Sequence, residues 1–100
     1  MKKQMFFMVD INKVKDIKVI YYVDTDDNIK TTLCAVPSDK DIRSKEVIEF
    51  IRCEIYGALS PILHVSISDC EELAKSIVHH GIADVFEYEF GVEEIQLFEC

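Results

Sequence analysis

The sequence predicts an α+β fold, namely a two-layer sandwich in which a mixed sheet of five or six strands packs against two helices in the order βββαβαββ. Three observations lead to this prediction. Residues 17–36 alternate between two faces at strand spacing, whereas residues 44–59 and 71–80 repeat apolar side chains at helical spacing. The chain is 49% hydrophobic with only three glycines and two prolines, so we expect one globular domain over residues 1–100.

Three strands are predicted before the first helix. The first is expected at Met5–Ile11, where both faces are largely apolar, as in a strand that is covered on two sides. The segments Ile17–Asp24 and Ile29–Val36 alternate more cleanly, and the Asp-rich residues between them predict a hairpin turn. The three strands together are expected to form an antiparallel meander.

The first helix is predicted over residues 44–59. Pro37 ends the preceding strand, and Ser38 followed by Asp41 resembles a helix-capping arrangement. One arc of the helix gathers the apolar side chains that should face the sheet, which are Val47, Ile48, Ile51, Ile55, Ala58 and Leu59. Phe50 lies outside this arc, and two interpretations apply to its ring: it packs under a neighbouring loop, or it is exposed and contacts a partner.

The next segment has the pattern of a βαβ unit. Pro61–Ile67 is predicted as a short strand, Ser68 and Glu71 have the spacing of a capping box, and Gly81 should end the second helix. A strand at Asp84–Phe90 would then lie parallel to the first strand of the unit. Gly91 interrupts the pattern before a last predicted strand at residues 94–99.

The net charge of −8 comes entirely from residues 51–100, because the first half of the chain has nine acids and nine bases. In the last predicted strands, aromatic residues alternate with carboxylates. Two interpretations apply: a solvated sheet edge that resists aggregation, or a negative stripe that binds a basic partner. The candidate partner-binding residues are Asp84, Glu87, Glu89, Glu93, Glu94 and Phe50.

Catalytic and metal-binding patterns are weak in this sequence. Cys70 is expected at the start of the second helix, where helix-terminal amides favour a thiolate, but the neighbouring Asp69, Glu71 and Glu72 oppose it. The cysteines are widely spaced, which predicts free thiols and no zinc site. The pair His79–His80 points in two directions on a helix, and no nucleotide-binding motif is present. We therefore expect no enzyme activity, no metal and no cofactor.

Charge and hydropathy also limit the partners and the location. Nucleic-acid binding is disfavoured because acids outnumber bases by 19 to 11. The apolar segments are too short to span a membrane, and the N-terminal apolar patch is too short for a signal peptide, so we expect a cytoplasmic protein. The predicted function is that of a small acidic interaction or inhibitory module with a basic protein partner, comparable in size and charge to phage accessory proteins, immunity proteins and antitoxins.

Two alternatives remain open at this point. One is a homo-oligomeric α+β domain, such as a homodimer, that binds a small ligand or acts as a sensor. The other is a cysteine-dependent enzyme that uses Cys70.

Overall fold

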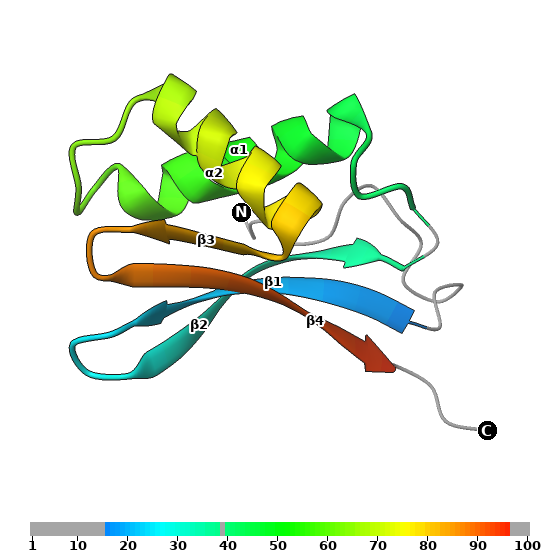
Figure 1. Ribbon diagram of the computed structural model, residues 1–100, viewed down its shortest axis with the longest axis horizontal. Coiled ribbons are helices and arrows are strands. Elements are labelled where there is room, and N and C mark those ends of the chain that lie inside the picture. Colours follow the sequence, from blue (N-terminus) through cyan, green and yellow to red (C-terminus); the bar gives the residue numbers. More distant parts are fainter. Residues whose placement is uncertain (1–15, 39, 97–100) are drawn as a thin grey trace, which may run out of the picture.

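A computed structural model describes residues 16–38 and 40–96 and shows an α+β fold in the order ββααββ (Figure 1). The six elements are β1 (Asp16–Asp24), β2 (Ile29–Pro37), α1 (Lys45–Leu59), α2 (Ile67–His80), β3 (Ile82–Val85) and β4 (Tyr88–Gln96). The strands form a four-stranded sheet in the order β2-β1-β4-β3, and all three pairs are antiparallel. The α+β class is confirmed, whereas the prediction of a mixed sheet with five or six strands was wrong.

The first two described strands form the hairpin that the sequence predicts. A β-bulge interrupts their pairing, because Ile20 pairs with Cys34 while Tyr21 pairs with Thr32. The extra residue, Leu33, is buried in the same core cluster as Cys34. The predicted strand at residues 5–11, and with it the third strand of the meander, lies outside the described residues.

The first helix is confirmed, but its cap lies later than predicted. The hydroxyl of Ser44 accepts a hydrogen bond from the Val47 N–H at 3.3 Å. Ser38 lies too far before Lys45 to cap this helix, and its N–H donates to the Asp16 carbonyl at 3.0 Å, which extends the pairing of β1 and β2. Phe50 is half-buried and packs against the main core, which favours the interpretation of a packed ring.

The predicted βαβ unit is absent from the described part of the chain. The second helix starts at Ile67 because Ser66 and Asp69 form a reciprocal capping box: the Ser66 hydroxyl accepts from the Asp69 N–H, and the Asp69 carboxylate accepts from the Ser66 N–H. The Ser66 N–H bond lowers the pKa of the Asp69 carboxyl. Residues 60–66 are therefore a connection between two helices and no strand, so β3 has no parallel partner.

The C-terminal strands also differ from the prediction. Gly81 ends α2 with a φ of 78°, as expected. The chain then turns at residues 86–87, and β4 continues through Gly91. A Cβ at Gly91 would lie 2.5 Å from the Tyr21 hydroxyl oxygen, so this glycine marks a close approach of two strands and not the end of one.

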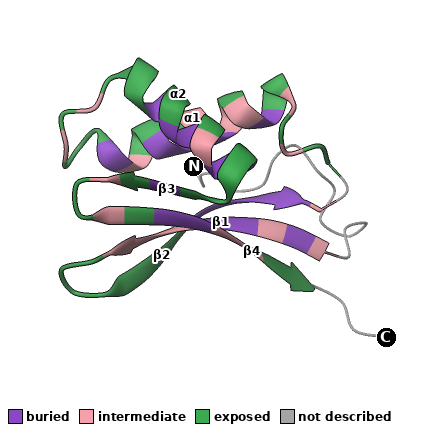
Figure 2. Cartoon of the chain, viewed as in Figure 1, coloured by how far each residue is buried: buried purple, intermediate pink, exposed green. Residues whose placement is uncertain are grey.

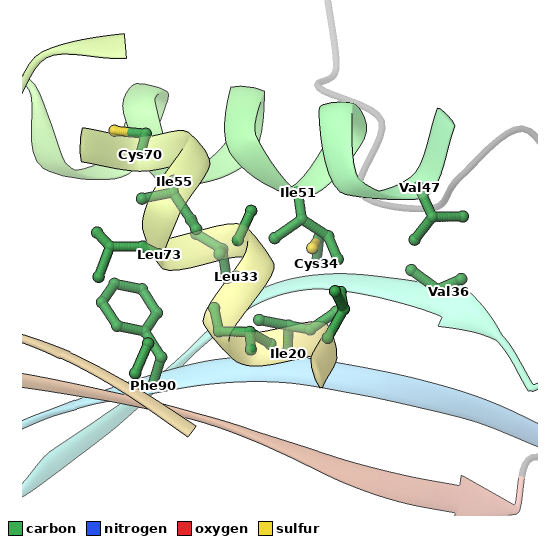
Figure 3. Close-up of a cluster of buried hydrophobic side chains, with 14 of the residues drawn as sticks. Ile20, Leu33, Cys34, Val36, Val47, Ile51, Ile55, Cys70, Leu73 and Phe90 are labelled. Atoms are coloured by element: carbon green, nitrogen blue, oxygen red, sulfur yellow. The ribbon is translucent and has the colours of Figure 1, made fainter. Parts of the chain in front are cut away.

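Both helices lie on one face of the sheet, and the main core fills the space between the two layers (Figure 2). Figure 3 shows side chains of α1 and α2 meeting those of the sheet: Ile20, Leu33, Cys34, Val36, Val47, Ile51, Ile55, Cys70, Leu73 and Phe90. A second, small buried cluster of Ile17, Val19 and Ala35 lies on the opposite face, as strand alternation requires. Neither helix is long and apolar enough to cross a membrane within the described residues.

Candidate protein-interaction surface

Two turns meet at one end of the sheet and bring carboxylates from distant parts of the sequence together (Figure 1). Thr25, in the turn between β1 and β2, donates two hydrogen bonds to the Glu87 carbonyl in the turn between β3 and β4: one from its N–H at 2.8 Å and one from its hydroxyl at 3.0 Å. We call the carboxylates around these turns the acidic end. They are Asp24, Asp26, Asp27, Asp84, Glu87 and Glu89.

The negative charge at the acidic end is concentrated by the strand register. Asp84 pairs directly with Glu89, and both residues are exposed. Like charges in directly opposite positions of a sheet repel each other, so this pairing does not stabilise the hairpin. Within residues 16–38 and 40–96, neither carboxylate has a basic nitrogen at ion-pair distance. A basic surface approaching this edge would relieve the repulsion.

The pKa of the Tyr88 hydroxyl depends on residues of both turns. Its pKa is raised, first by partial burial and then by the negative charges of Asp24 and Glu87. Asp24 belongs to the first turn and Glu87 to the second. The two turns therefore form one electrostatic surface.

Phe86 occupies the tip of the β3–β4 hairpin in an unusual state. Its side chain is 79% exposed, and its backbone φ is 53°. A positive φ is uncommon for any residue other than glycine and is an outlier for a bulky aromatic residue. Backbone strain of this kind is typical of functional sites, and an exposed aromatic side chain is a common anchor in protein interfaces.

The structure separates the residues of the predicted acidic stripe. Asp84, Glu87 and Glu89 lie together at the acidic end. Glu93 is instead paired with Lys30, whose Nζ lies 2.8 and 2.9 Å from the two carboxylate oxygens. Glu94 lies opposite Lys18 on the helix-covered face of the sheet, and Phe50 packs against the core.

Sequence reasoning missed the three aspartates of the first turn as part of this surface. The Asp-rich turn at residues 24–28 was expected to be a hairpin turn only, and this is confirmed. Its place beside Glu87 depends on the pairing of β1 with β4, which no local pattern reveals.

Comparisons with protein-family models, curated proteins and solved structures found no match to this chain. The acidic end must therefore be interpreted from its own chemistry.

A hollow of about 460 Å³ adjoins the acidic end, between α2 and the β3–β4 hairpin. The residues that line it include Asp69, Glu72 and Asp84 together with Phe86 and His64. Carboxylates beside an aromatic ring suit a cationic group, because both attract positive charge. A lysine or arginine side chain has the required shape, with an apolar stem and a charged head.

The other residues considered for chemistry are arranged differently. Cys70 is fully buried, and its burial, followed by the charge of Asp69, raises the pKa of the thiol, although Arg52 acts in the opposite direction. The thiolate that a cysteine nucleophile needs is thus disfavoured. His79 and His80 are exposed at the end of α2, and no cluster of three metal-ligating residues occurs in the described ranges.

Proposed function

We propose that this protein is a small acidic protein-interaction module that uses its acidic end to bind a basic surface of a partner protein. The observation that carries the proposal is the strained and exposed Phe86, which projects from a hairpin rimmed by Asp84, Glu87 and Glu89. Carboxylates around an aromatic anchor provide both attraction over a distance and apolar contact at close range.

The support for a rigid contact comes from Thr25. Its two hydrogen bonds hold the Glu87 carbonyl, so the tip of the hairpin is fixed before a partner arrives. A preorganised tip loses less conformational entropy on binding than a flexible one. The adjoining hollow offers a place for one lysine or arginine side chain of the partner.

An inhibitory role is the form of this function that fits the chemistry best. A protein that covers a basic active surface, as immunity proteins and antitoxins do, needs a compact fold with unpaired carboxylates on one edge. Among the described residues the acidic end has this property, since its charge comes from three strands and two turns and none of its carboxylates is in an ion pair, while Lys30 binds Glu93.

The test is affinity purification of a partner from the native host, followed by calorimetry with the purified pair. We expect a basic partner whose affinity falls as salt rises, and a loss of about tenfold in the double variant Glu87→Gln/Glu89→Gln. The matched control is Asp41→Asn/Glu46→Gln, which removes two exposed charges near the start of α1 and should change the affinity little. Equal affinities for the two double variants would overturn the proposal.

A further inference from the structure

A second charged surface lies between the outer flanks of the two helices. A hollow of about 630 Å³ runs between α1 and α2. Both arginines of the chain line it, Arg43 and Arg52, together with Lys45 and Lys75. We call this hollow the helix groove. In a protein with a net charge of −8, such a concentration of positive charge is unexpected.

Only part of this positive charge is neutralised within the groove. Glu49 lies 3.5 Å from Arg52, and Glu71 lies 3.0 Å from Lys75. For Arg43 and Lys45, no carboxylate of the described residues is within ion-pair distance. The groove therefore keeps an excess of two positive charges near the start of α1.

Apolar side chains also line the helix groove. Ile67, at the start of α2, is 55% exposed, and Ile48 of α1 is half-buried. One exposed isoleucine alone would be ordinary on a protein surface. The exposed Ile67 beside the half-buried Ile48, within a concave and positively charged surface, matches the requirements of a ligand with an apolar anchor and negative flanks.

The acidic end of the same protein has these two properties. Its hairpin tip has the exposed Phe86 among carboxylates, whereas the hollow of the helix groove has isoleucines among bases. We propose that the β3–β4 hairpin of a second copy of this chain binds in the helix groove, with Phe86 against Ile48 and Ile67. Glu87 would then face Arg43 and Lys45.

Each contact joins two different surfaces. Two copies related by a two-fold axis would make this contact twice and form an isologous dimer, whereas copies joined by one contact each would form a heterologous, head-to-tail assembly. One aromatic anchor and a few exposed ion pairs make each contact weak and dependent on salt. The inference uses the hairpin assigned under the proposed function, and self-association would cover the acidic end until a basic partner displaces the second copy.

The test measures the sedimentation velocity of the purified full chain over a range of concentrations. We expect the average sedimentation coefficient to rise with concentration at about 50 mM salt and to stay constant at about 500 mM, where charges are screened. A chain that remains monomeric at every concentration at low salt would overturn the inference.

Two charge reversals identify the surfaces. The hairpin variant Glu87→Lys/Glu89→Lys and the groove variant Arg43→Glu/Lys45→Glu should each lose at least about tenfold in association constant, because like charges then face each other. An equimolar mixture should associate again, because each variant supplies the surface that the other lacks. Restored association also shows that both variants are folded.

Three results would contradict the inference. If either variant alone associates like the original chain, or if the mixture stays monomeric, the helix groove does not bind the hairpin. Association that is insensitive to salt would assign the interface to apolar residues elsewhere and contradict the inference. The groove variant keeps its acidic end, so its binding to a basic partner tests the proposed function separately.

Discussion

The two turns at the acidic end are stabilised by different means. In the turn between β1 and β2, three backbone N–H groups bond to oxygens of the same turn. The Asp24 carboxylate accepts a hydrogen bond from the Asp26 N–H at 2.9 Å, and the Asp24 carbonyl accepts one from the Asn28 N–H at 2.7 Å. The Asp27 carboxylate accepts one from the Ile29 N–H at 3.0 Å. Asn28 has a φ of 60°, which asparagine tolerates better than most residues. This turn is consistent with its own sequence.

The residues of the turn between β3 and β4 do not favour its backbone conformation in this way. Phe86 has a φ of 53°, and its own side chain has no polar group that could stabilise this conformation by a hydrogen bond. The Glu87 carbonyl accepts its two hydrogen bonds from Thr25 of the first turn. The first turn therefore supports both itself and its neighbour. The first turn is thus a structural element, whereas the second maintains an exposed aromatic residue in a conformation that this residue does not favour.

The largest effect is expected from Asn28→Val, which should destabilise the fold by about 1–2 kcal/mol, because a β-branched residue is strained at a positive φ. Urea unfolding measures the change. The control Asn28→Gly keeps the backbone conformation accessible and should change the stability by less than about 0.5 kcal/mol. A valine variant as stable as the glycine variant would show that the first turn does not depend on this conformation.

A smaller effect of opposite sign is expected from Phe86→Gly, which relieves the strained φ. It should stabilise the fold by up to about 1 kcal/mol, with the higher entropy of glycine in the unfolded chain offsetting part of the gain. Phe86→Ala removes the ring but retains the strain, so it should give no stabilisation in the same thermal or urea experiment. Partner binding should weaken in both variants. A destabilised glycine variant would contradict the contrast between the two turns.

The smallest effect concerns the titration of Tyr88. Because its pKa is raised partly by Asp24, the variant Asp24→Asn should lower this pKa toward the ordinary phenol value of about 10. Ultraviolet titration of the tyrosinate, with Tyr88→Phe to identify the signal, measures the shift. Since the folded pKa exceeds the unfolded one, the neutral phenol contributes stability below about pH 10 that is lost as the pH rises through the folded value. An unchanged pKa would mean that the two turns do not share their charge.

Local patterns in the sequence predicted the parts of the fold that local physics determines. The hairpin of β1 and β2, the helix over residues 45–59 and the end of α2 at Gly81 follow from alternation, helical periodicity and a left-handed glycine. The predicted start of α2 was wrong because two serines have the sequence spacing of a capping box. Ser66 with Asp69 and Ser68 with Glu71 have the same spacing, and the choice of the later cap left room for a strand that does not form.

Other errors arose where distant segments meet. Gly91 resembled a strand end because its real constraint, the Tyr21 side chain above it, lies on another strand. For the same reason, the sequence predicted Asp84, Glu87 and Glu89 as an acidic group but could not separate Glu93, whose partner Lys30 comes from β2. The aspartates of residues 24–27 lie at the acidic end because the sheet order places β1 beside β4.

The position of β4 beside β1 also has a consequence for folding. The sheet order places the first and last described strands at the centre, with Asp16 paired to Gln96. Contacts between such distant residues slow folding, because a long loop must close before the pairing can form. During synthesis β1 and β2 leave the ribosome early, and one edge of β1 stays open until residues 88–96 follow. In that interval an unpaired edge is exposed to other chains, so the newly made protein is most prone to aggregation before residues 88–96 pair with β1.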